Sequence, residues 1–473
     1  MKLFMNEFLE SLAIDPQSHA LITTDNPVMT YGKLLQCITD LGSFIPKRSL
    51  VFIISKNSIG SIIGYLTCIS MRSVPLLLDS SIKEPYLLKL IKLYRPHYLL
   101  VPGSFMKDFQ FGKKLTKVYD YDLYALDGKS ARLPNNELAL LLTTSGSTGN
   151  PKMVRLSYKN IITNSMAIIK YLKITKEDKP ITTLSMSYSY GLSIINTHIL
   201  SGSSIILNEL SIISKGFWSY FEKTKPTSIS GVPYHFELLN KLNTWQYSFS
   251  SIKKITQAGG HLDSAIKKEF ISYCVLHNKL FFTMYGQTEA TARMSYVPPH
   301  MALDKCDSIG KPVEGGHFQI LDSLGELIRK PREQGALVYL GANVCLGYAT
   351  DRNDLLKGDE FEGVLNTGDI AWFDEDGFYY LSGRQSRLGK LFGIRVNLDD
   401  IERHLRKSNI EAACIATSTG LSIFVVGVES LLTTRLTVKE LLKSSENGVR
   451  YISIPRIPRA ANGKILYSQL KEE

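Results

Sequence analysis

A loop of small and hydroxyl-bearing residues that ends in a lysine is the part of the sequence best suited to chemistry. It reads Thr143-Thr144-Ser145-Gly146-Ser147-Thr148-Gly149-Asn150-Pro151-Lys152. The backbone N–H groups of such a loop can converge on one anion and form a nest for phosphate, and the ammonium of Lys152 adds a compact positive charge. A Walker loop, G-x-x-x-x-G-K-[ST], is excluded because Asn-Pro follows Gly149 and Met153 follows the lysine. The spacing predicts phosphate binding, and the alternative is a flexible Ser/Gly linker.

The elements that must position this loop belong to an α/β pattern. The apolar run 138–142 directly before the loop predicts a short buried strand. Similar runs alternate with amphipathic stretches through the first part of the chain, as an α/β sheet requires. Further strands are predicted at 50–54, 73–78, 182–185 and 204–207, and helices at 58–71, 158–172 and 191–200, with Ser157 as an N-cap.

From about residue 309 the pattern changes to short β runs separated by turns. Such runs occupy 318–321, 336–340 and 378–381, and the turn signal Asp-Glu-Asp-Gly lies at 374–377. This pattern predicts a small β-barrel or a twisted sheet. After Gly383-Arg384 a short α+β tail is predicted, with a helix over 398–407.

Length and charge set the class of protein. At 473 residues the chain is too long for one core, so several domains are expected. Lysine and arginine outnumber aspartate and glutamate by 55 to 44, a balance that suits nucleotides, pyrophosphate or coenzyme A. Because the basic residues are spread along the chain, a solvated surface is favoured over a nucleic-acid groove.

The cysteines and the N-terminus bear on location. The six cysteines are scattered without a C-x-x-C pair, which predicts reduced thiols in a cytoplasmic protein rather than a zinc site or a disulfide scaffold. The N-terminal residues lack the apolar region of a signal peptide. No apolar run approaches the ~20 residues of a spanning helix, so no membrane span is predicted.

Four further motifs lie downstream of the loop. They are Y-G-x-T-E at 285–289, T-G-D at 367–369, G-R-(x)5-K-x-x-G-x-R-V at 383–396 and P-R-x-x-x-G-K-I at 458–465. In this order and spacing the motifs resemble the adenylate-forming (AMP-binding) superfamily, which includes acyl-CoA synthetases, luciferase and the adenylation domains of nonribosomal peptide synthetases. The resemblance covers nearly the whole chain.

The resemblance implies a domain arrangement. A large N-terminal AMP-binding domain would span 1–384 and contain two α/β subdomains plus a small β-barrel at about 309–384. A small mobile α+β lid domain would follow at 387–473, with a hinge near 385–387. Ser386 stands where the family usually has aspartate or lysine, so altered hinge behaviour is expected.

The resemblance also implies the reaction. A carboxylate attacks the α-phosphorus of ATP, pyrophosphate leaves, and an acyl-adenylate forms that a thiol then attacks. Such chemistry needs positive charge and fixed donors rather than a strong base. The catalytic residues would be Lys464, bridging the attacking carboxylate and the α-phosphate, Thr288, touching that phosphate, and Glu289, binding Mg²⁺. The ATP-binding residues would be Thr144, Ser145, Gly146, Ser147, Thr148, Gly149, Lys152, Gly259, Gly260, Tyr285, Gly286, Asp369, Arg384 and Arg395.

Some of these assignments have structural alternatives. Taken alone, Asp369 would be a turn former and Lys464 a solvated lysine. In the family, Asp369 would instead accept hydrogen bonds from the ribose hydroxyls, with Arg384 nearby, while Gly259, Gly260 and Tyr285 would frame the adenine.

The acid is the least determined part of the prediction. No aspartate occurs between Asp178 and Asp263, so a partner for the ammonium group of an amino acid is missing and α-amino acids are disfavoured. A small or medium pocket is predicted, lined by Tyr188, Tyr190, Gly191, Val232, Ala258 and Met294. For Val232 and Met294, ordinary core packing is an equal alternative.

The sequence therefore predicts an AMP-forming acid–thiol ligase that uses ATP, Mg²⁺ and coenzyme A. One alternative is a stand-alone adenylation enzyme that loads the phosphopantetheine of a separate acyl carrier protein. Another is a degenerate nucleotide-binding regulator, against which the retention of Lys152, Glu289, Asp369 and Lys464 argues. A small carboxylic acid is the expected substrate, and no nucleic-acid partner is expected.

Overall fold

The computed structural model describes residues 15–24, 28–105, 112–126, 133–143, 152–242, 249–391, 394–417, 420–442, 448–459 and 465–470. Contacts divide them into two compact units. The first comprises the described residues up to 143 together with 152–317 and 340–365, and the second comprises 318–339 and the described residues from 366 onward. The chain is α/β with mixed sheets, as predicted.

An eight-stranded mixed sheet in the first unit carries the strands that flank the predicted phosphate loop. Its order is β19-β9-β8-β4-β3-β5-β7-β6. The central strands β8, β4, β3 and β5 run parallel, and β9 returns antiparallel to β8, with Thr143 opposite Met153. The strands are β3 (Leu50–Ser55), β4 (Val74–Asp79), β5 (Tyr98–Pro102), β6 (Lys113–Val118), β7 (Tyr121–Ala125), β8 (Leu138–Thr143), β9 (Met153–Ser157) and β19 (Tyr348–Ala349).

A nine-stranded sheet in the same unit brings Gly259, Gly260 and the Y-G-x-T-E motif to one edge. Its order is β16-β15-β14-β13-β12-β10-β11-β1-β2. The strands β12, β13 and β14 are parallel and in register, so their carboxyl ends lie together, which is where open α/β sheets bind ligands. The strands are β1 (His19–Ile22), β2 (Met29–Thr30), β10 (Pro180–Ile181), β11 (Ile205–Ile206), β12 (Ser228–Gly231), β13 (Lys254–Gln257), β14 (Leu280–Tyr285), β15 (Ser295–Tyr296) and β16 (Lys311–Pro312).

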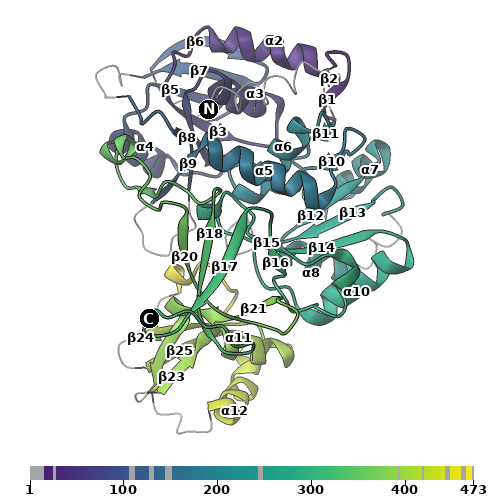
Figure 1. The fold of residues 1–473 in the computed structure, drawn as a ribbon, viewed down its shortest axis with the longest axis vertical. Helices are drawn as coiled ribbons and strands as arrows, with labels where there is room; N and C mark the ends of the chain where they lie inside the picture. The colour runs from purple at the N-terminus through teal and green to yellow at the C-terminus, as the bar shows by residue number, and fades with distance from the viewer. Residues whose placement is uncertain are drawn as a thin grey trace. The chain divides into compact units, whose positions relative to one another are not determined.

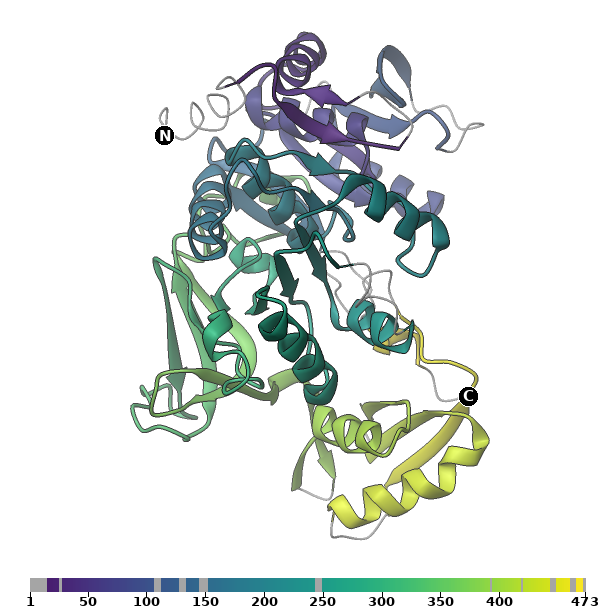
Figure 2. The same ribbon diagram turned by 90° about the vertical axis from the view of Figure 1, so that its right-hand side faces the viewer.

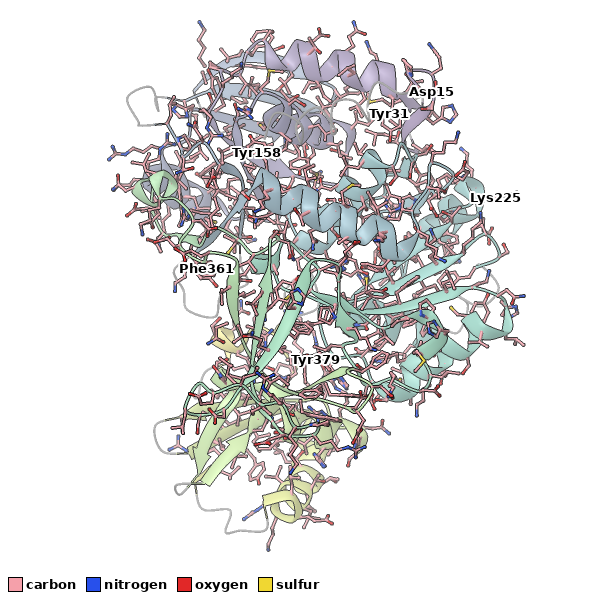
Figure 3. All side chains as sticks on the ribbon, viewed as in Figure 1. Asp15, Tyr31, Tyr158, Lys225, Phe361 and Tyr379 are labelled. Atoms are coloured by element: carbon pink, nitrogen blue, oxygen red, sulfur yellow. The ribbon has the colours of Figure 1, made fainter. Side chains whose placement is uncertain are left out.

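Helices of the first unit pack against these sheets, and one buried cluster joins residues of both sheets to α3, α5 and α6. In Figure 1, α5 and α6 lie side by side. Tyr31 and Tyr158, labelled in Figure 3, are the first residues of α2 and α5. The helices are α2 (Tyr31–Gly42), α3 (Ile59–Ser70), α4 (Glu84–Tyr94), α5 (Tyr158–Leu172), α6 (Ser189–Leu200), α7 (Lys215–Thr224), α8 (Pro233–Leu242) and α10 (Ser264–Leu276).

The N-cap prediction at α5 is confirmed. The side chain of Ser157 accepts from the backbone N–H of Asn160, and the Asn160 side chain accepts from the N–H of Ser157, which completes a capping box. A cap of this kind contributes about 1 kcal/mol. It fixes the point where the chain leaves β9 and enters the helix.

The strand predicted at 182–185 is wrong. The strand β10 ends at Ile181, although the N–H of Thr182 still bonds to the carbonyl of Ile206 in β11. The Asn57 side chain donates to the carbonyl of Leu184 and accepts from the N–H of Met186. After Thr182 the chain is held by the Asn57 side chain rather than by sheet pairing.

The second unit contains most of a four-stranded sheet with the order β17-β18-β20-β21. Its strands are β17 (Gly316–Leu321), β18 (Gly335–Gly341), β20 (Val364–Phe373) and β21 (Tyr379–Arg384); Tyr379 is labelled in Figure 3. The turn predicted at 374–377 joins β20 to β21, and Asp374 Oδ1 accepts from the N–H groups of Asp376 and Phe378. The order is open, so closure into a small β-barrel is not confirmed.

The rest of the second unit is α+β. A hairpin of β22 (Leu388–Leu391) and β23 (Ile394–Asn397) precedes a three-stranded sheet of β24 (Ala412–Thr417), β25 (Gly420–Val426) and β26 (Val449–Ile454). The helices α11 (Leu398–Lys407) and α12 (Leu431–Leu442) pack on this sheet, coloured light green to yellow in Figure 2. Its core contains Ile401, Leu405, Ile423 and Val425. The helix predicted at 398–407 is confirmed.

Short 3₁₀ turns complete the structure: η2 (Thr288–Ala290), η3 (Pro299–Met301), η4 (Asn353–Leu356), η5 (Gln385–Arg387), η6 (Val428–Ser430) and η7 (Tyr467–Gln469). All six cysteines are buried and free. In the part of the chain that the structure describes, no helix has the length and apolar character needed to cross a bilayer.

Candidate active site

Glu289 lies in η2, directly beyond the carboxyl end of β14. Its Oε1 atom accepts a hydrogen bond of 2.9 Å from the hydroxyl of Tyr348, and its backbone carbonyl accepts from the N–H of Cys345. Burial and the charge of Glu289 raise the pKa of the Tyr348 phenol far above its ordinary value, so the phenol remains a proton donor. Within the described ranges Glu289 forms no ion pair, and the side chain is half-buried. The carboxylate of Glu289 is therefore held by a neutral group.

Lys152, which follows the predicted phosphate loop in the sequence, contacts the same tyrosine. Its Nζ atom lies 5.6 Å from the centroid of the Tyr348 ring, within the range of a cation–π contact. Phe361, labelled in Figure 3, packs edge-on against that ring with centroids 5.6 Å apart. The buried Arg155 donates to the backbone carbonyls of Tyr348 and Leu346. Lys152 and Glu289, far apart in sequence, are thus brought together by Tyr348.

Thr288 faces the start of α6. Its Oγ1 atom lies 3.1 Å from Oγ of Ser189, the first residue of that helix. Tyr285, at the end of β14, accepts a 3.4 Å hydrogen bond from Gln287 Nε2. A Cβ atom at Gly286 would lie 1.8 Å from the carbonyl oxygen of Ala292, so only glycine fits there. The predicted role of Gly286 in ATP binding therefore has a packing explanation beside it.

The glycine pair after β13 is held in an unusual conformation. Gly259 has a φ of +88°, which favours glycine, and a Cβ there would lie 2.8 Å from Oη of Tyr188. The buried Gln257 donates from Nε2 to the carbonyl of Gly260 at 3.0 Å. Gly260 itself is exposed. Gly259 thus allows Tyr188 and Val232 to pack closely on this backbone, and a contact of Gly259 or Gly260 with adenine stays a prediction.

The residues predicted to line the acid pocket are mostly packed. Tyr190, Val232 and Ala258 belong to one buried cluster, and Met294 is fully buried outside it. A Cβ at Gly191 would lie 2.2 Å from the carbonyl oxygen of Ser185, so this glycine permits close packing of α6. Tyr188 is half-buried at the edge of the cluster. Core packing thus describes Val232 and Met294, and a substrate contact by these residues stays a prediction.

A clamp on the segment after η2 was not foreseen from the sequence. Thr291 and Ala292 have φ angles of 55° and 103°, a rare conformation for such residues. The buried Asn343 donates to the carbonyls of Ala290 and Arg293, and the buried Asn164 also donates to that of Arg293. These amides fix the residues that follow Glu289. The signal in the sequence was weak, because isolated asparagines have many structural uses.

In the second unit, Asp369 lies within β20 rather than in a turn. Its side chain is buried and accepts a 3.1 Å hydrogen bond from Nε of Arg384, the residue opposite it in β21. Its N–H donates to Oγ1 of Thr367, and Gly368 has a φ of +71°. The carboxylate is therefore held at a fixed place with a guanidinium beside it.

Several predicted residues cannot be placed. Thr144, Ser145, Gly146, Ser147, Thr148 and Gly149, as well as Lys464, lie outside the described residues. Arg395 lies in β23 in register with Lys390. On either side of Lys464, Arg459 and Ile465 pair with each other as an isolated bridge.

The carboxylate of Glu289 in the first unit suits a magnesium ion that is bound mainly by the phosphates of a nucleotide. Among the described residues no three acidic, histidine or cysteine side chains could hold a metal ion together. Mg²⁺, however, is commonly bound by one or two carboxylates plus substrate phosphates. Glu289, with one oxygen bonded to the neutral Tyr348, suits that mode.

Comparison with known proteins places this site in a family. The model for the family described as AMP-binding enzyme matches residues 8–349. The 2-succinylbenzoate–CoA ligase of Bacillus subtilis is 24% identical over 488 residues, which covers 99% of this chain and 97% of that protein. The corresponding ligase of Bacillus pumilus is 29% identical over 255 residues, 54% of this chain, and the match spans 50% of that protein.

Solved structures agree in fold. The o-succinylbenzoate CoA synthetase of Bacillus subtilis, in complex with an acyl-adenylate intermediate, superposes with a TM-score of 0.80 at 20% identity, covering 99% of this chain and 98% of that one. ATP-bound MatB from Rhodopseudomonas palustris gives 0.77 at 18% identity, with coverage of 98% and 97%. The resemblance drawn from the motifs and the predicted enzyme class are confirmed. This chain belongs to the family of AMP-binding enzymes.

Proposed function

We propose that this protein joins a small carboxylic acid to coenzyme A in two steps that consume ATP. In the first, a carboxylate oxygen of the acid bonds to the α-phosphorus of ATP, the bond from that phosphorus to the β-phosphate oxygen breaks, and pyrophosphate leaves. In the second, the thiol of coenzyme A loses its proton and bonds to the acyl carbon, and AMP leaves. The family and the class of its curated relatives support this reaction.

The observation that carries the proposal is the convergence of Lys152, Tyr348 and Glu289. Lys152 directly follows a sequence that can form a phosphate nest, and Glu289 has no charged partner among the described residues. Together these two groups would bind one polyphosphate, Lys152 directly and Glu289 through a metal ion. When bound, Mg²⁺ would neutralise phosphate charge, and Glu289 would hold it through oxygen. The phenol of Tyr348 would keep this carboxylate oriented, because its hydrogen bond fixes one of the two oxygens.

Other residues have narrower proposed roles. Thr288, beside Ser189, would donate to the α-phosphate, and the flat backbone at Gly259 would lie against the base. Asp369 would accept from the ribose hydroxyls. Lys464 would balance the charge of the attacking carboxylate and the α-phosphate, where two anions must approach each other.

The proposal includes a mobile lid at the C-terminal end of the described chain. Residues 387–473 would act as a mobile α+β domain that turns about a hinge near 385–387, and the region 309–384 would act as a small barrel. The exposed serine at the hinge, Ser386, would permit rotation without a charged partner to hold either position.

The acid and the acceptor define the alternatives. Relatives named 2-succinylbenzoate–CoA ligase make 2-succinylbenzoate the first acid to test, and coenzyme A the first acceptor. The phosphopantetheine of a separate acyl carrier protein is the second acceptor to test. A cytoplasmic location and a carrier-protein partner stay predictions from the sequence.

The test is acid-dependent exchange of labelled pyrophosphate into ATP, measured over a panel of carboxylic acids with Mg²⁺. Strong exchange with one acid is expected, followed by thioester formation when coenzyme A is added. Thioester formation only with a carrier protein would favour the alternative acceptor. No exchange with any acid, in a preparation that still binds ATP, would favour the degenerate regulator and reject the ligase.

A further inference from the structure

Arg293 is a buried cation in the first unit that the proposed reaction does not use. Its side chain belongs to a residue that is only 3% exposed. Its Nη1 atom donates to the carbonyl of Ala292 at 3.1 Å, and its Nε atom lies 3.3 Å from the sulfur of Met284. No carboxylate in the described parts of the chain lies within ion-pair distance of this guanidinium.

Aromatic rings surround the guanidinium instead. Its Cζ atom lies 3.9 Å from the centroid of the Tyr190 ring, which is a cation–π contact. Burial raises the pKa of Tyr190, and it raises the pKa of Tyr188 to about 12; the positive charge of Arg293 acts against both shifts. The phenols are therefore neutral at ordinary pH and cannot neutralise the arginine.

This arrangement differs from that of two other buried cations of the same unit, although Lys267, also buried, donates to the carbonyl of Cys306. The ammonium of Lys254 is paired with Asp178 at 2.8 Å, and the fully buried Arg155 is paired with Glu360. An isolated buried charge is costly, and proteins normally pair it or place a ligand against it. The planar fork of arginine matches a carboxylate in two parallel hydrogen bonds.

The start of α6 connects this arginine to the proposed reaction centre. Three consecutive residues make the connection: Tyr188 lies against the backbone of Gly259, Ser189 against Thr288, and Tyr190 against Arg293. Under the proposed function, Thr288 contacts the α-phosphate, so the reacting carboxylate must lie close to Thr288. The carbon skeleton of an acid that extends along α6 would then bring its other end toward Arg293.

We infer that Arg293 is a specificity-determining residue that binds a second anionic group of the acid, so that the substrate is a dicarboxylate or an equivalent dianion. The inference rests on the proposed function, because it needs the activated carboxylate at Thr288. The competing explanation is a structural arginine, satisfied by the Ala292 carbonyl, the Tyr190 ring and a hydrogen bond to the Tyr171 hydroxyl.

The test compares pairs of acids that differ only in the second carboxylate. Suitable pairs are 2-succinylbenzoate against 4-oxo-4-phenylbutyrate, phthalate against benzoate, and succinate against butyrate. Pyrophosphate exchange gives kcat/KM for each acid with the wild type, Arg293→Gln, Arg293→Lys and Lys170→Gln. Lys170→Gln is the matched control, because it removes one positive charge from an exposed side chain on α5.

The wild type and Lys170→Gln should prefer the dianionic member of at least one pair by about 30-fold or more, the lower end of the cost of removing one partner of a buried charge pair. Arg293→Gln should abolish that preference, and Arg293→Lys should keep part of it. The ratio of kcat/KM for the two acids of a pair, measured in one preparation, does not depend on the fraction of folded enzyme. A less stable variant therefore still gives a valid preference. Equal use of both members by the wild type, or a preference unchanged in Arg293→Gln, would overturn this inference alone. No exchange with any acid would reject the proposed function and, with it, this inference.

Discussion

In the first unit, Glu289 and Arg293, which follow β14, lack charged partners among the described residues, whereas Arg387 of the second unit is matched in ion pairs. Glu289 is bonded to a neutral phenol, and Arg293 packs against a neutral ring. In the second unit, Arg387 bonds to both Asp399 and Glu402. Under the proposed function, the charges of Glu289 and Arg293 would serve ligands, while the paired charge of Arg387 holds the fold of the second unit.

The groups that hold these charged residues in place also differ between the two units. In the first unit, Asn164 and Asn343 hold the backbone after Glu289 with amide groups, which add no charge near the site. In the second unit, the carboxylate of Glu402 accepts from Arg387, from the N–H of Cys414 and from the hydroxyl of Tyr467. Tyr467 lies three residues beyond Lys464, so this network anchors the tail that carries the proposed catalytic lysine.

The replacement Lys464→Ala would test the comparison most severely, because Lys464 would be a ligand-binding charge in the unit where Arg387 is held by ion pairs. Exchange of pyrophosphate should fall by about 1,000-fold, the upper range for losing one group that stabilises charge in a transition state. Arg459→Gln is the control, since Arg459 is paired with Glu411 at 3.0 Å and should have a small effect. Full exchange activity in Lys464→Ala would reject the assigned mechanism.

The replacement Arg387→Met should destabilise the second unit by about 3–5 kcal/mol, because it leaves the carboxylate of Glu402 buried without its cation. Chemical denaturation measures this change. The double variant Arg387→Met with Glu402→Gln should recover part of the loss, since the buried charge is then gone while the amide still accepts hydrogen bonds. Equal stability of Arg387→Met and the wild type would show that the network does not hold this unit together.

The replacement Tyr348→Phe should have the smallest of these effects. It removes the hydrogen bond to Glu289 but keeps the ring beside Lys152. Exchange activity should fall by about 10-fold, as expected for a hydrogen bond to a charged group, and the concentration of Mg²⁺ needed for half-maximal exchange should rise. An unchanged magnesium requirement would mean that Glu289 does not need this phenol for its orientation.

Local signals in the sequence predicted much of the fold. The helix at 158–172 agrees in both bounds with α5, because the Ser157 cap and the helical spacing act together. The helix at 398–407 agrees with α11 for a similar reason, with Asn397 as its cap. The strand β20 was not predicted, because T-G-D suggests a turn and the bonds that make it a strand come from distant residues.

The sequence predicted which residues form the candidate site, but not the hydrogen bonds and packing contacts between them. Glu289 and Lys152 were identified from motifs, whereas the hydrogen bond from Tyr348 to Glu289 spans 59 residues of sequence. Arg293 carried no signal at all. An arginine is usually exposed, and only the fold shows that this one is buried and packed on Tyr190.

The most direct measurement is acid-dependent pyrophosphate exchange by Glu289→Gln beside the wild type, with denaturation curves to show that both are folded. Glutamine keeps the shape and the hydrogen bond from Tyr348 but removes the charge meant for a ligand. Exchange should fall by about 100-fold or more, while stability changes by less than about 1 kcal/mol, because Glu289 has no ion pair to lose among the described residues. A folded Glu289→Gln enzyme with undiminished exchange would show that this charge is not kept for the nucleotide.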